Sequence, residues 1–153
     1  MIRFSCMLLT LLAAIGMSTG AVAQTAAPGA SLTTADDSLY NAFGGKAGIS
    51  KVIDDLLVVW QGDPRISAAL KDADVDRLAA LLKEQFTQLT GGPAVYSGKD
   101  MKTIHDGMGL RNAHFNALAE DLQIAMEKNG VPSRAQNKLL SKLAPLQRDI
   151  VTK

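Results

Sequence analysis

The chain has 153 residues, which is about the length of one ordinary domain. Its 16 lysines and arginines stand against 15 aspartates and glutamates, and a net charge of +1 gives no electrostatic reason to expect a nucleic acid or an anionic membrane surface as partner. The single cysteine, Cys6, excludes an intramolecular disulfide, and the chain has no Cys-x-x-Cys-His motif for covalent haem attachment.

The first 23 residues have the features of a cleaved signal peptide. A short basic start, Met1-Ile2-Arg3, precedes an apolar core of about a dozen residues that is too short to span a bilayer. Ala21-Val22-Ala23 matches the small-residue motif before a cleavage site, so we expect a periplasmic or secreted product that has no membrane association after cleavage. Residues 24–35 are small, polar and aperiodic, which predicts a flexible tether before a domain at 36–153.

The first part of this domain predicts two helices. Asp36 and Asp37 can cap a short helix that ends at Gly44-Gly45. From Gly48 onward, apolar residues recur at the spacing of one helical face, and Gly62-Asp63-Pro64 ends the pattern. Val58 and Val59 extend the apolar surface almost all the way round, so we expect this helix to be central. The face consists of Ile49, Val52, Ile53, Leu56, Leu57 and Trp60.

A second amphipathic helix follows a short connection through Ile66 and Leu70. Asp72 or Asp74 can cap it, and Gly91-Gly92-Pro93 ends it. Its apolar stripe is Val75, Leu78, Leu82, Phe86 and Leu89.

The remaining pattern predicts three more helical segments and no strand. After a loop at 94–99, Asp100 can cap one or two turns that hold Met101, Ile104 and His105. A longer helix with the stripe Phe115, Leu118, Leu122 and Met126 closes at Gly130. Ser133 and Gln136 have the spacing of a capping box at the start of a last helix, which Pro145 should bend. No segment alternates with period two for long enough to be a strand, so the predicted fold class is all-α.

His105 is the main candidate for chemistry in this chain. It is one of two histidines, in the stretch "KDMKTIHDGMGL", and taken alone it is compatible with an ordinary surface histidine at a helix end. His114 is nine residues away on another segment, and two histidines without a cysteine do not make a zinc site. One histidine that faces an apolar cleft is, however, the ligand that a haem iron takes from the protein.

Three motifs together resemble those of the group I truncated haemoglobins. They are "SLYNAFGG", "LTGGPAVYSGKDM" and "IHDGMGLRNAHF", and the resemblance runs from Ser38 to about Val151. It implies a truncated globin, a two-over-two helical sandwich around non-covalently bound haem b (iron protoporphyrin IX), with His105 as the proximal iron ligand. By the same resemblance, His114 is a structural residue near the start of a helix.

The resemblance also places residues on the distal side of the haem. Leu57 falls where an oxygen-binding tyrosine is often found, and Leu78, Leu81 and Leu82 fall where polar residues often face the ligand. Leu70 replaces the usual phenylalanine of this region. The implied pocket has no hydrogen-bond donor for bound oxygen, which carries partial negative charge, so we expect oxygen to bind about tenfold to a hundredfold more weakly than in a polar pocket.

Further haem contacts are expected from residues near His105 and from the pocket rim. Arg77, Tyr96 and Lys99 are candidates to meet the haem propionates, although solvated surface charge explains them equally well. Met108 as a sixth iron ligand is disfavoured because it is on the proximal side. The other expected haem contacts are Phe86, Met101, Met108 and Phe115.

Three functional hypotheses remain open from the sequence. The first is an exported haem protein that binds a diatomic gas, namely oxygen, nitric oxide or carbon monoxide, with an unidentified periplasmic reductase as a candidate partner. The second is a haem enzyme that handles nitric oxide or peroxide; the peroxide version is disfavoured because the aligned pocket lacks a distal acid or base. The third is a helical interaction module without haem.

Overall fold

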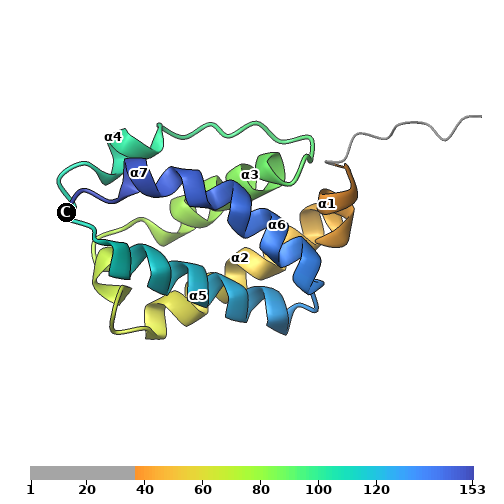
Figure 1. The fold of residues 1–153 in the computed structure, drawn as a ribbon, viewed down its shortest axis with the longest axis horizontal. Coiled ribbons are helices and arrows are strands. Elements are labelled where there is room, and N and C mark those ends of the chain that lie inside the picture. Colours follow the sequence, from red (N-terminus) through yellow and green to blue (C-terminus); the bar gives the residue numbers. More distant parts are fainter. Residues whose placement is uncertain (1–36) are drawn as a thin grey trace, which may run out of the picture. The chain divides into compact units, whose positions relative to one another are not determined.

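The computed structural model describes residues 37–153, and the expected signal peptide, tether and Asp36 cap lie outside that part of the chain. Residues 37–153 are helical and contain no strand, so the predicted all-α class is confirmed (Figure 1). No helix among them is both long enough and apolar enough to cross a membrane. The elements are α1 Asp37–Ala42, α2 Gly45–Gly62, the 3-10 helix η1 Ser67–Leu70, α3 Val75–Leu89, α4 Met101–His105, α5 Asn112–Lys128, α6 Ser133–Leu143, the 3-10 helix η2 Ala144–Leu146 and α7 Gln147–Ile150.

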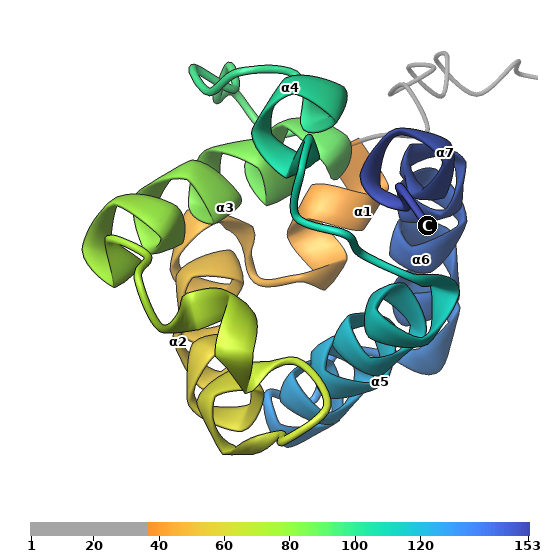
Figure 2. The same ribbon diagram turned by 90° about the vertical axis from the view of Figure 1, so that its left-hand side faces the viewer.

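Two pairs of helices form the body of the domain. α2 packs against α3 and also against α5, while α5 packs against α6. Figure 2 shows α2 and α3 on one side and α5 and α6 on the other. The core lies where α2 meets these neighbours, because its apolar stripe is enclosed there. Its largest fully buried apolar side chains are Ile49, Val52, Ile53, Leu56, Met126 and Leu139.

α2 begins three residues earlier than its apolar pattern indicated. Gly44 and Gly45 have φ angles of 76° and 64°, which suit glycine and let the chain turn sharply from α1 into α2. At Gly48, a Cβ atom would lie 1.8 Å from the carbonyl oxygen of Phe43, so the turn between the two helices lies too close to α2 there for a side chain. The expected central position of α2 is confirmed by its packing against α3 and α5, but Val58 is 67% exposed because these neighbours cover another side of the helix.

Aspartate caps begin α3 and α4, as the sequence predicted. The carboxylate of Asp74 accepts a hydrogen bond from the backbone N–H of Arg77 at 3.0 Å. Asp100 accepts from both the backbone N–H and the hydroxyl of Thr103, at 2.9 and 2.7 Å. These bonds, the hydroxyl first, hold the pKa of Asp100 below its usual value. The start of α4, which carries His105, is therefore fixed by its own sequence.

The predicted capping box at the start of α6 does not form. Pro132 is the residue before the helix, Ser133 is its first helical residue, and no side chain caps it. Gln136 is buried and donates instead to the carbonyl of Val131 at 2.8 Å. Proline has no side-chain oxygen that could accept from the first free N–H groups, so the helix starts without a side-chain cap. At Pro145, where a bend was expected, the α-helix is interrupted: α6 gives way to η2 before α7 begins.

Candidate functional site

An apolar cavity of about 350 Å³ lies between α2, α3, α4, α5 and the C-terminal helices. This volume falls within the range of small-molecule and cofactor sites, which are mostly apolar with a few polar groups. The wall is formed by Leu56, Trp60, Leu78, Leu81, Leu82, Gln85, Phe86, Tyr96, Met101, Ile104, His105, Phe115, Leu118, Ala119, Leu122, Leu140, Leu143, Ala144, Leu146 and Ile150.

His105 forms part of this wall from the last position of α4. Its Nδ1 atom lies 2.7 Å from the carbonyl oxygen of Met101, one turn earlier in the same helix. A carbonyl oxygen only accepts, so Nδ1 is the donor and carries a proton. In the neutral ring Nε2 then keeps its lone pair, and this is the tautomer that a metal-binding imidazole needs. The cavity thus combines apolar walls with one nitrogen ligand, a donor set that fits haem.

Three other side chains of the wall carry hydrogen-bond donors. The indole N–H of Trp60 donates to the carbonyl of Ile66 at 3.0 Å, and the hydroxyl of Tyr96 donates to the carbonyl of Lys99 at 2.9 Å. Burial, with a smaller effect of nearby Asp100, raises the pKa of Tyr96, so its phenol keeps the proton that it donates. The N–H of Trp60 and the O–H of Tyr96 therefore both bond to backbone carbonyls and are not free to donate to a group in the cavity.

Gln85 is the third donor, and the sequence analysis did not anticipate it. Its amide nitrogen lies 3.5 Å from the sulfur of Met101, which is a weak acceptor. Gln85 is seven residues after Leu78 and three after Leu82, so all three share one face of α3. The expected absence of hydrogen-bond donors therefore holds for the leucines but not for the whole cavity wall. The helical spacing from Leu78 could have identified Gln85 as a wall residue.

Most residues expected at a haem site line the cavity. They are Leu78, Leu81, Leu82, Phe86, Tyr96, Met101, His105 and Phe115. The structure also brings in residues that the sequence analysis did not assign to a site, chiefly Leu56 and Trp60 of α2 and the apolar stripe of the C-terminal helices. Periodicity identified those stripes as core, but it could not say which core residues border a cavity.

Leu57, Leu70 and Met108 lie outside the wall of this cavity. Leu57 and Leu70 are buried. On α2 it is Leu56 and Trp60, four residues apart on one face, that reach the cavity, and Leu57 is turned about 100° from Leu56. Met108 is 46% exposed and lines a separate cavity of about 550 Å³, because it follows the end of α4 in a loop. Direct haem contacts by these three residues stay predictions from the family resemblance.

The remaining candidate side chains lie at the edges of the domain. Arg77 and Lys99 are exposed, so both interpretations of their charges, propionate partner and solvated surface, stay open. His114 accepts a hydrogen bond from the backbone N–H of Arg111 through Nδ1, at 3.3 Å, and so helps to begin α5. This is the structural role that the resemblance implied for it.

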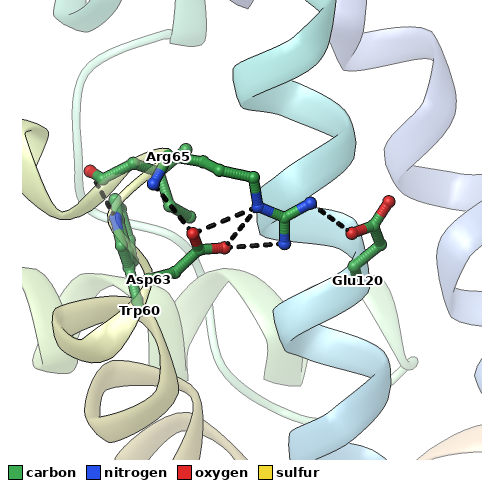
Figure 3. Close-up of polar contacts among 5 residues, drawn as sticks. Trp60, Asp63, Arg65 and Glu120 are labelled. Atoms are coloured by element: carbon green, nitrogen blue, oxygen red, sulfur yellow. Dashed lines mark hydrogen bonds and ion pairs between the residues drawn. The ribbon is translucent and has the colours of Figure 1, made fainter.

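A charge cluster fixes the turn that follows Trp60 (Figure 3). The guanidinium of Arg65 donates to both carboxylate oxygens of Asp63, with its Nε at 3.1 and 2.9 Å, and to Glu120 of α5 at 2.5 Å. The bonds from Arg65 hold the pKa of Asp63 below its usual value. The cluster joins the end of α2 to α5 through Arg65. It thereby stabilises the turn whose Ile66 carbonyl accepts from the indole N–H of Trp60.

Asp121 lies beside this cluster and is 2% exposed. One carboxyl oxygen shares a hydrogen bond with Asp63, while Oδ2 has no partner. Burial, and secondarily the negative charge of Asp63, raise the pKa of Asp121. The folded state therefore favours the protonated acid, which can donate to Asp63.

We expect Asp121→Asn to stabilise the domain at neutral pH by about 1 kcal/mol, because an amide donates to Asp63 without a charge and leaves a neutral amide oxygen in place of the partnerless carboxylate oxygen. Since the folded-state pKa of Asp121 is raised, its favourable contribution is complete below the ordinary value of 3.8 and is lost as pH rises through the folded-state pKa. Denaturant unfolding at several pH values measures this. A variant no more stable than the parent at pH 7, or a gain that does not shrink on acidification, would contradict it.

Comparisons with known proteins agree with this geometry. Residues 38–152 match the family model described as bacterial-like globin. A group 1 truncated haemoglobin of Mycolicibacterium paratuberculosis is 32% identical over 115 residues, which cover 75% of this chain and 85% of that protein. The crystal structure of the truncated haemoglobin from Tetrahymena pyriformis in its Fe(III) form superposes with a TM-score of 0.73 at 28% identity, over 75% of this chain and 98% of the other.

The fold also resembles that of the 2/2 haemoglobin from a Synechococcus species, with a TM-score of 0.69 at 21% identity over 75% of this chain and 98% of the other. That structure is described as having covalently attached haem. Together with the family match, these likenesses show that the chain belongs to the bacterial-like globins as a group I truncated haemoglobin with the two-over-two fold. Proteins of this class bind haem and, through it, gaseous ligands.

Proposed function

We propose that this chain binds haem b non-covalently through His105 as proximal iron ligand, and that it binds a diatomic gas, namely oxygen, nitric oxide or carbon monoxide, in an apolar distal pocket. The observation that carries the proposal is the state of His105 in the cavity wall. Its Nδ1–H is held by the carbonyl of Met101 at 2.7 Å, which leaves Nε2 as a bare nitrogen ligand beside an apolar space.

The haem would supply an iron atom at which a small gas molecule can bind. The chain's own residues would do the rest. The carbonyl of Met101 orients the imidazole and keeps it in one tautomer, while Leu78, Leu81 and Leu82 of α3 exclude water from the opposite wall. With Trp60 and Tyr96 committed to backbone carbonyls, these leucines give a gas ligand little hydrogen bonding.

Non-covalent attachment is supported by the side chains of the cavity wall. The chain has no cysteine after Cys6, so no thiol can add to a vinyl group of the porphyrin. His105 is the one histidine among the cavity-lining residues that the structure describes. If it binds iron, no second imidazole remains in the wall to form a covalent bond with the haem.

Export to the periplasm or the exterior is part of the same proposal. It is supported by the basic start, the apolar core and the Ala21-Val22-Ala23 motif. An unidentified periplasmic reductase would be the partner that keeps the iron in its ferrous state. N-terminal sequencing of the protein produced in its own host tests the export step, with Gln24 as the expected first residue.

The central test is an absorption titration of the purified chain, residues 24–153, with haemin. We expect one equivalent to produce a sharp Soret band, which shifts on reduction and again on addition of carbon monoxide. Acidified organic solvent should then extract all the colour from the protein. A chain that stays colourless with added haemin would contradict the proposal and would support the haem-free interaction module, whereas colour that remains with the protein would contradict non-covalent attachment.

A further inference from the structure

The loop that follows His105 has little rigidity of its own. Gly107 and Gly109 have φ angles of 74° and 63°, and Asp106, Gly107 and Met108 are exposed. α4 itself has five residues, none of them fully buried. Such a short helix gains little from packing or from its own hydrogen bonds, so the position of its C-terminal end depends on contacts from other parts of the chain.

Residues 151–153, here called the C-terminal latch, supply such contacts to this loop. The carbonyl oxygen of Leu110 accepts from the backbone N–H of Thr152 at 2.9 Å and from that of Lys153 at 3.1 Å. A Cβ atom at Gly109 would lie 3.3 Å from the side chain of Lys153, so the latch also lies directly on the glycine. Residues 42 and 43 positions apart in the chain are thereby joined.

The segment that leads into the latch contacts α4 and the cavity. α7 packs against α4, and both lie near the C-terminus in Figures 1 and 2. Leu146 and Ile150 of this segment line the cavity, and Gln147 donates to the side chain of Asn112 at 3.1 Å. The segment from Leu146 to Lys153 therefore lines the candidate haem cavity at one end and bonds to the loop after His105 at the other. A group that fills the cavity would press on the same stretch that holds the loop.

We propose that Thr152 and Lys153 are positioning residues for the proximal ligand, because their backbone N–H groups hold the loop after His105 and so fix the end of α4 relative to the iron. The inference rests on the proposed function, since it gives His105 the role of iron ligand. It goes beyond that function by assigning the position of His105 in part to the C-terminal latch, which bonds to the loop after it.

Proline and alanine at the same positions separate the backbone role from the side-chain role. Thr152→Pro and Lys153→Pro each remove one N–H donor, while Thr152→Ala and Lys153→Ala keep it. In the haem-loaded proline variants we expect haem release to a scavenger apoprotein to be about twofold to tenfold faster, the range that loss of one hydrogen bond gives. We also expect the iron–histidine stretching band of the ferrous protein to shift or broaden, with Thr152→Ala matching the parent and Lys153→Ala closer to the parent than Lys153→Pro.

Denaturant unfolding of the same variants tests for a general loss of stability. We expect the unfolding midpoint of the proline variants to change little while their iron–histidine band moves. If a proline variant does not fold, amide exchange in the parent protein decides instead. The N–H groups of Thr152 and Lys153 should exchange slowly in the ferrous carbon monoxide form and faster without haem. Two results would overturn the proposed role of the C-terminal latch. One is proline variants that keep the parent's haem release rate and stretching band, and the other is latch amides that exchange at the rate of a free peptide in the haem-loaded protein. A parent chain that takes up no haem overturns the proposed function itself.

Discussion

Replacing His105 with alanine will abolish the Soret band of a normally ligated haem and weaken haemin binding by more than about 100-fold. The estimate follows because even residues that only orient a metal ligand change metal affinity by about 10- to 100-fold, and His105 would be the ligand itself. The chain offers a matched control, since His114 is its other histidine and bonds to the backbone of Arg111 outside the cavity. His114→Ala should retain the parent spectrum.

A glycine variant makes this test more specific. His105→Gly leaves a space of about one imidazole, so added free imidazole should restore the spectrum of the ferric protein. Restoration shows that the missing group is a nitrogen ligand and not a packing residue of α4. An unchanged Soret band in His105→Ala, together with its loss in His114→Ala, would reverse the assignment of the two histidines.

Oxygen should leave the ferrous protein rapidly, and Leu82→Gln should slow its dissociation by about tenfold to a hundredfold. Leu82 lies in the cavity wall, and the family resemblance places it where a polar residue often faces the ligand. A glutamine there can donate to bound oxygen, and a hydrogen bond to a charged group contributes about 1.5 to 3 kcal/mol. Carbon monoxide binds with less charge separation, so its dissociation should change much less.

Stopped-flow displacement of oxygen by carbon monoxide gives these rates. Leu82→Met is the matched control, because it has similar length and volume but no N–H donor. Gln85→Leu provides a second comparison: the amide of Gln85 is directed at the sulfur of Met101, so its loss should leave the oxygen rate unchanged. Slow oxygen release in the parent chain, or equal effects of glutamine and methionine at position 82, would refute an apolar distal pocket.

Local sequence was sufficient to predict the elements that hold the candidate ligand. Asp100, and either Asp72 or Asp74, were predicted as caps because an aspartate before an apolar helical pattern can satisfy free N–H groups at the first turn; Asp74 and Asp100 do so here. Pro145 breaks the last helix for an equally local reason, since it has no N–H to donate. His105 was placed at the end of a short helix, and the family resemblance gave it a role.

Expectations failed where the outcome depended on a neighbour. Ser133 and Gln136 had the right spacing for a capping box, yet Gln136 bonds to the carbonyl of Val131 and Pro132 precedes the helix. Val58 continued an apolar pattern but faces solvent, because α3 and α5 cover another side of α2. A residue's own neighbours in the sequence carry no information about which face a distant helix will cover.

The amino-acid sequence by itself determined the all-α class, the helix start at Asp100 and the family to which the chain belongs, because spacing, caps and motifs are local properties. Only the tertiary structure decided that Gln85, Trp60 and the C-terminal stripe border the cavity, and that Thr152 and Lys153 bond to Leu110. These features join segments that are far apart along the chain. Their geometry arises when the helix pairs pack, and no local pattern records it.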